Sequence, residues 1–152
     1  MKNKKNCVCA IVSILIFSAL LVGFTFSGDR DLDSALSELN VNAKMDFGDY
    51  KTEICLGYNI SESKFDYFSG TIKMEPADIY MAAELSMITK TPIDKVIVTY
   101  QANKGKGWGQ IAKELGIKPG SAEFKALKGK AHSHNAKIKE KSKNKGKKNK
   151  NK

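Results

Sequence analysis

Asn103–Lys128 reads NKGKGWGQIAKELGIKPGSAEFKALK, and it joins a Gly/Lys loop, the chain's one tryptophan, a short amphipathic segment and a Pro-Gly turn. Its apolar residues recur at the spacing that places them on one face of a helix: Trp108, Ile111, Ala112 and Leu115. Gly116 can adopt the left-handed conformation that ends a helix, and Ser121 is a favourable cap for the start of another. The stretch therefore predicts two helices joined by a tight turn.

The Gly/Lys loop before the tryptophan has two interpretations. Its glycines leave backbone amides unobstructed at a helix start, where the helix dipole is positive, and its lysines add charge. That combination suits a phosphate, sulfate or carboxylate, with these candidate anion-binding residues: Lys104, Gly105, Lys106, Gly107 and Trp108. The alternative is a plain turn in which the tryptophan fills the core and the lysines are solvated. The spacing fits neither a P-loop nor a dinucleotide-binding fingerprint.

Five further helices are predicted upstream from apolar periodicity and capping residues. They are expected to begin near Asp31, Asp46, Glu62, Pro76 and Ile93. Gly70 is expected to end the third, and Pro92 is expected at the first helical position of the fifth, where its missing N–H costs nothing. Residues 96–99 are all β-branched, so a strand is the alternative there.

Three of the predicted turns resemble one another, because each runs from a leucine through a turn to a Ser or Thr and then to an apolar residue. The leucines, Leu56, Leu85 and Leu115, are 29 and 30 residues apart. A repeat of this length is typical of stacked helix pairs, each of which buries its face on its neighbour. The expected fold is all-α, a small bundle or stack of about three helix-turn-helix-like pairs.

Residues 1–27 are typical of a signal peptide. Three lysines precede an uncharged apolar run from Val8 to Phe26, and Thr25 and Ser27 suit cleavage before Gly28. The alternative is an uncleaved membrane anchor, since a run of this length just spans the hydrocarbon core of a bilayer. Under either interpretation the lysines stay inside, and the chain that follows is expected to be extracytoplasmic.

The charge is divided unevenly along the chain. Residues 28–124 carry 11 basic and 15 acidic groups, whereas residues 125–152 carry 12 lysines and one glutamate. Residues 28–128 are expected to form the helical domain, and residues 129–152 a disordered tail with too few apolar side chains to fold. The tail lysines suit non-specific contact with polyanions, or they only solubilise the chain: Lys137, Lys139, Lys141, Lys143, Lys145, Lys147, Lys148, Lys150 and Lys152.

Few residues suggest chemistry. Cys55 is the only cysteine after the predicted signal, and we interpret it as a small buried apolar residue. His132 and His134 are too few for a metal site, so no metal or cofactor is expected. The scattered carboxylates are interpreted as caps or solvated helix faces: Asp66, Asp78, Glu84, Asp94 and Glu114. Without a catalytic motif, we expect a protein that is not an enzyme.

The run KGKGWGQIAKELGIKPGSAEFKALK (residues 104–128), together with the segments LDSALSELNVNAK and PADIYMAAELSMITKTPIDKVIVTYQANKG, resembles a group of small exported bacterial proteins without an assigned activity. The resemblance covers most of residues 31–128 and implies an exported helical domain, with no particular chemistry. More loosely, GQIAKELGIKPGSAEFKAL is similar to a helix-turn-helix, with Ser121–Leu127 at the place of the recognition helix.

The sequence thus favours an exported binding or adaptor protein of the cell envelope or exterior, acting through the loop, the tail or both. The expected partner is a protein or an anionic envelope component, with non-specific nucleic acid as a further candidate and membrane association through residues 8–26 if they are not cleaved. Two alternatives remain, a DNA-binding regulator with the membrane segment in the opposite orientation and a small enzyme of unknown class.

Overall fold

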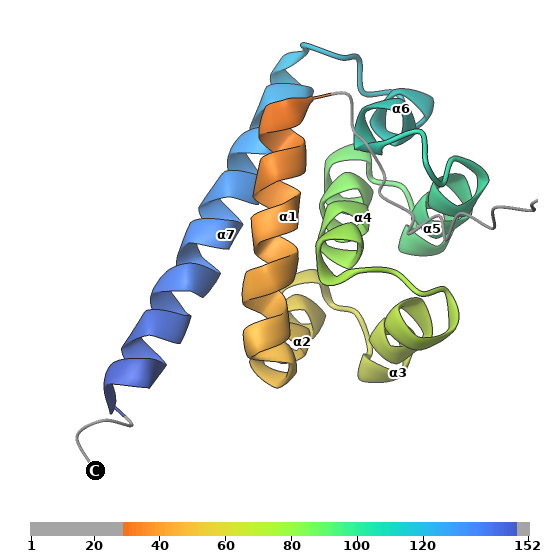
Figure 1. The fold of residues 1–152 in the computed structure, drawn as a ribbon. Helices are drawn as coiled ribbons and strands as arrows, with labels where there is room; N and C mark the ends of the chain where they lie inside the picture. Colours follow the sequence, from red (N-terminus) through yellow and green to blue (C-terminus); the bar gives the residue numbers. More distant parts are fainter. Residues whose placement is uncertain (1–28, 149–152) are drawn as a thin grey trace, which may run out of the picture.

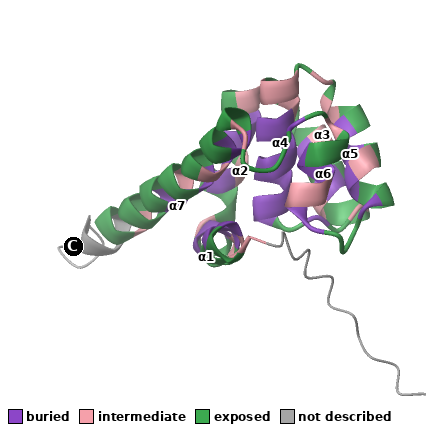
Figure 2. Cartoon of the chain, turned by 90° about the horizontal axis from the view of Figure 1, so that it is seen from above, coloured by how far each residue is buried: buried purple, intermediate pink, exposed green. Residues whose placement is uncertain are grey.

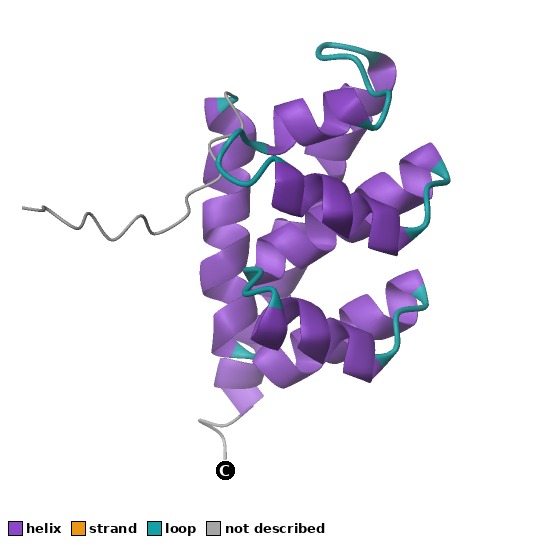
Figure 3. Cartoon of the chain, turned by 90° about the vertical axis from the view of Figure 1, so that its right-hand side faces the viewer, coloured by secondary structure: helices purple, strands orange, loops and turns teal. Residues whose placement is uncertain are grey.

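The computed structural model describes residues 29–148, with side chains up to Asn144. Every regular element among these residues is helical and none is a strand (Figure 3), which confirms the all-α prediction. The elements are α1 (Arg30–Met45), α2 (Phe47–Tyr58), α3 (Glu62–Asp66), the π-helical turn η1 (Tyr67–Thr71), α4 (Pro76–Thr89), α5 (Ile93–Ala102), α6 (Trp108–Glu114) and α7 (Ala122–Lys148).

The export signal and its alternative, a membrane anchor, lie outside the described residues. Within residues 29–148, no helix combines the length and the apolar content that crossing a bilayer requires.

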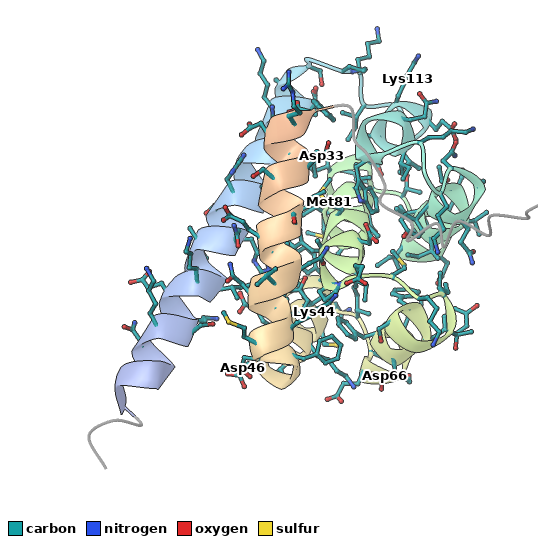
Figure 4. All side chains as sticks on the ribbon, viewed as in Figure 1. Asp33, Lys44, Asp46, Asp66, Met81 and Lys113 are labelled. Carbon is teal, nitrogen blue, oxygen red and sulfur yellow. The ribbon has the colours of Figure 1, made fainter. Side chains whose placement is uncertain are left out.

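Helix α4 is the centre of the fold. Every residue from Pro76 to Leu85 is buried, because α1, α2, α5 and α7 all pack around this helix. Helices α1 and α7 run side by side and in the same direction along one side of the molecule (Figure 1). Met81, which is fully buried, is among the side chains between α1 and α4 (Figure 4).

The predicted helix pairs are present as α2 with α3, α4 with α5, and α6 with α7. Each first helix is followed by a residue with left-handed backbone: Asn59 at φ 52°, Lys90 at φ 54° and Gly116 at φ 92°. The next helix begins three residues after Asn59 and after Lys90, whereas the third turn is longer. Gly116 has the role predicted for it, and the first two turns share one geometry.

Two predicted boundaries are wrong. Gly70 does not end its helix but lies within η1, where Ile72 N donates to Tyr67 O at 3.1 Å across five residues. The wider turn lets the backbone continue to Ile72, so that both Phe68 and Met74 are buried. Pro92 is the N-cap residue of α5, and the first helical residue is Ile93.

Residues 96–99 are helical in α5, which excludes the strand alternative. Their apolar side chains divide as a helix requires, since Val96 and Ile97 are buried and Val98 is 63% exposed. Burial against α4 outweighs the modest preference of β-branched residues for strands.

The last described segment of the chain is helical. The structure continues α7 through residues 129–148, within the stretch that the sequence predicts to be a disordered tail. The small and apolar residues Leu127, Ala131 and Ile138 follow the three- and four-residue spacing of a helix face and are buried. A sparse apolar stripe is enough here, because polar contacts with α1, α2 and α4 supplement it.

Candidate functional site

Trp108 belongs to the core and not to a ligand-binding surface. Its side chain is fully buried and stacks on Tyr100, with ring centroids 5.3 Å apart. The indole Nε1 donates to Asp78 Oδ1 at 2.9 Å, and the hydroxyl of Tyr100 donates to Asp78 Oδ2 at the same distance. Helices α4, α5 and α6 are thus joined at one buried carboxylate.

Burial disfavours the ionised form of the Asp78 carboxyl. Burial raises its pKa above the ordinary value, against the hydrogen bonds from Trp108 and Tyr100 that lower it. The carboxylate also caps α4, since it accepts from the backbone N of Glu75 at 3.4 Å. Because the pKa is higher in the folded state, this group contributes stability at acid pH that is lost as the pH rises through the folded value.

The Gly/Lys loop connects α5 to α6 as a tight turn. Gly105 and Gly107 both have positive φ, at 92° and 82°, which side-chain-bearing residues rarely adopt. Lys106 N donates to Asn103 O at 2.9 Å, and Lys106 Nζ lies 3.1 Å from Asn103 Oδ1. Lys104, Gly105 and Lys106 are exposed, whereas Gly107 and Trp108 are buried, so only the first three of the five predicted anion-site residues face solvent.

A second buried carboxylate joins α2, α4 and α7. Glu84 Oε1 accepts from Tyr58 Oη at 2.6 Å and from Tyr80 Oη at 3.3 Å, and its Oε2 accepts from Lys130 Nζ at 2.8 Å. Burial raises the pKa of both tyrosines, so they remain protonated donors at neutral pH. Asp78 is a cap, as predicted, but neither Asp78 nor Glu84 is solvated, and each organises a buried polar cluster.

Acidic residues of the domain hold α7 in place. Lys128 Nζ lies 2.7 Å from Asp29 Oδ2 and 3.2 Å from Asp31 Oδ2, which lowers the pKa of both carboxyls and raises that of the lysine. Farther along, Asn42 Nδ2 donates to Asn135 Oδ1 at 2.7 Å, and Lys141 pairs with Glu53. The acidic domain and the basic helix thus neutralise each other in part.

The outer side of α7 is exposed (Figure 2), and the sequence places many lysines on this helix. Among the predicted tail residues, Lys137, Lys139 and Lys143 are exposed and form no ion pair with the described residues. Lys141 is also exposed but pairs with Glu53. The remaining predicted tail lysines lie beyond the described side chains: Lys145, Lys147, Lys148, Lys150 and Lys152.

The loop and the basic helix do not form one site. Helix α7 lies at one edge of the molecule, and α5 and α6 lie at the opposite edge in two perpendicular views (Figures 1 and 2). A single small anion therefore does not reach both sets of lysines, and the two surfaces have to be tested separately.

His132 and His134 point to different neighbours. His132 Nε2 lies 3.2 Å from Asp31 Oδ1 of α1. His134 stacks on Tyr80 of α4, with ring centroids 4.3 Å apart and planes within 6° of parallel. The structure thus does not bring the two imidazoles together around a common ligand.

Cys55 is buried, which confirms the structural interpretation of this thiol. It lines a groove of about 380 Å³ together with Leu56 of α2, Glu62 of α3 and Ser61, the N-cap residue of α3. Burial raises the pKa of the Cys55 thiol, so the thiol stays protonated at neutral pH, and a protonated thiol is a poor nucleophile.

Comparisons with protein-family models, curated proteins and solved structures give no match to this chain. The resemblance to small exported bacterial proteins therefore stays a prediction. The two buried carboxylate clusters were not predicted, although a weak signal was present, since Asp78 and Glu84 lie within an otherwise apolar helix. An acidic residue in such a stretch calls for buried donors elsewhere in the chain.

Proposed function

We propose that this chain is a non-enzymatic binding protein that acts outside the cytoplasm and contacts anionic polymers or anionic surfaces through the outer side of α7. The observation that carries the proposal is the set of three exposed lysines, Lys137, Lys139 and Lys143, on a helix whose inner side is already packed. The helix fixes the positions of these three residues along the chain, and none of them forms an ion pair with a described residue. Glu140 is the one acidic residue among residues 125–144.

The outer side of α7 fits contact by charge without insertion into a bilayer. Between the lysines it carries small exposed residues, Ala126, Gly129 and Ala136, and the large exposed hydrophobic residues of the described chain all lie on other elements. A helix that inserts into the membrane interface needs a free apolar face, and that of α7 is packed against the domain. Phosphate, sulfate or carboxylate groups on a polymer or a surface are the chemistry that fits.

A charge-removal experiment tests this surface. We expect the triple variant Lys137→Gln, Lys139→Gln, Lys143→Gln to elute from heparin at lower salt than the parent. The slope of log K against log salt should fall by roughly 2 to 3, because each lysine that releases a counterion contributes about 0.9. Thermal stability should be unchanged, since these side chains are exposed.

The matched control removes three charges at the opposite edge: Lys104→Gln, Lys106→Gln, Lys113→Gln. All three lysines are exposed, and Lys113 is on α6 beyond the loop (Figure 4). If α7 is the binding surface, this variant keeps most of the parent's retention. A larger loss in the control would assign binding to the loop, and equal losses would show that only net charge matters. Either result contradicts the proposal.

The extracytoplasmic location has its own test. A reporter enzyme that is active only outside the cytoplasm, fused after Lys152, should be active. An inactive fusion that is expressed intact would contradict export and favour the DNA-binding alternative, which requires the opposite orientation.

A further inference from the structure

We infer that His134 is a pH-sensitive latch, which holds the C-terminal part of α7, from His134 onward, on α2 and α4 at neutral pH and releases it on mild acidification. The inference does not depend on what α7 binds. It rests on the position of the imidazole between two tyrosines and on the absence, among the described residues, of a hydrogen-bond acceptor where a second proton would be placed.

The imidazole is packed as an aromatic core residue. Its side chain is only 11% exposed, it stacks on Tyr80 of α4 at 4.3 Å, and it meets the edge of Tyr50 of α2 at 6.0 Å. Both tyrosines are themselves buried, and Tyr50 Oη is committed to the backbone O of Pro76 at 2.8 Å. The ring of His134 therefore fixes α7 to two helices at once.

The surroundings of the ring favour the neutral imidazole over the charged imidazolium. Nδ1 faces Glu53 Oε1 at 3.9 Å, so a neutral ring carrying its hydrogen on Nδ1 points it toward this carboxylate. Nε2 is buried and has no hydrogen-bond partner among the described residues. A second proton would create a charged donor at Nε2 with nothing to accept from it, which is among the costliest arrangements in a protein interior.

The surrounding charges do not offset this cost. The two carboxylates that would favour the imidazolium already have partners, since Glu84 accepts from Tyr58 and Lys130 and Glu53 pairs with Lys141. The carboxylates of α1 that reach this part of α7 contact the neighbouring residues His132 and Asn135. The titratable and charged groups around the ring are Tyr50 and Glu53 of α2, Tyr80 and Glu84 of α4, and Lys130, Lys137 and Lys141 of α7.

The direction of the pH effect follows. Burial lowers the pKa of His134 below its ordinary value, although Glu53 and Glu84 act to raise it, and Lys137 and Lys141 act in the same sense as burial. The released segment binds the proton more readily than the docked one, so docking weakens as the pH falls below the ordinary value of about 6.5. Protonated His134 then favours a state in which the ring reaches water and Lys141 separates from Glu53.

Hydrogen exchange of the full chain measures the release directly. We expect amides from His134 to the end of α7 to lose about tenfold in protection between pH 7.5 and pH 5.5, after correction for the intrinsic exchange rate, while α4 stays protected. His134→Phe keeps the aromatic packing without a titrating group and should hold the segment at both pH values. His132→Gln removes the exposed histidine and should behave like the parent.

Three results would overturn the latch: equal protection of the parent segment at both pH values, a pH-dependent loss that persists in His134→Phe, or a loss that disappears in His132→Gln. If His134→Phe does not fold, the titration of the two imidazoles in the parent, followed by NMR, decides. His134 must titrate below the ordinary imidazole value of about 6.5, and an equal or higher value contradicts the inference.

Discussion

Replacement of Trp108 by alanine is expected to lower the free energy of unfolding by about 3–5 kcal/mol, the usual cost of deleting a large buried aromatic side chain. The side chain is fully buried, and its loss also deprives Asp78 Oδ1 of the donor at 2.9 Å. Since single domains are stable by about 5–15 kcal/mol, the variant is expected to be partly unfolded at 37 °C.

The milder variant Trp108→Phe separates the two contributions. Phenylalanine retains most of the apolar volume but has no N–H, so its cost should be dominated by the hydrogen bond lost at a buried carboxylate, about 1.5–3 kcal/mol. Urea unfolding followed by circular dichroism provides the free energies, since fluorescence changes with the tryptophan itself. Lys113→Ala on the same helix is the control, because Lys113 is exposed. A Trp108→Ala cost below about 1 kcal/mol would contradict a core role.

The sequence predicts the helices well where the signal is local. Ser121 is predicted to cap a helix, and its hydroxyl accepts from the backbone N of Phe124 at 3.2 Å. Ser61 caps α3 in the same way, accepting from the backbone N of Lys64 at 3.3 Å. The left-handed backbone of Gly116 is predictable for the same reason, because the residues that indicate it are its neighbours in the sequence. Caps and turns depend on neighbouring residues, so a single sequence contains the necessary information.

The long-range polar pairs could not be predicted in the same way. Glu84 and Lys130 are 46 positions apart, and no periodicity indicates that they meet. Whether α7 folds onto the domain depends on such pairs, because its composition alone predicts disorder. The low apolar content is compensated by acidic residues of α1, α2 and α4, which only the tertiary structure brings beside the lysines. The candidate loop was similarly ambiguous, because its glycines suit a turn as well as an anion site.

Truncation after Lys128 is expected to destabilise the whole domain, and not merely to remove a charged extension. It deletes the buried residues Ala131 and Ile138, whose side chains pack in the same core as α4. It also leaves the buried groups of Asn42 and Glu84 without Asn135 and Lys130.

Burial of the isoleucine is worth about 1.5–3 kcal/mol, and each of the two unsatisfied buried polar groups costs about 1–3 kcal/mol, so the loss should be roughly 4–9 kcal/mol. Thermal and urea unfolding of the truncated and full chains, measured at equal protein concentration, provide this difference.

The matched truncation, after Asn144, separates packing from charge. It keeps the buried side of α7, including Ile138 and the ion pair of Lys141 with Glu53, and removes the five lysines at the end of the chain. Its unfolding free energy should lie within about 0.5 kcal/mol of the parent, whereas its retention on heparin should weaken and become less dependent on salt. Equal stability of the two truncations would mean that residues 129–144 are not part of the folded domain, and the exposed lysines would then have no fixed arrangement with which to select a partner.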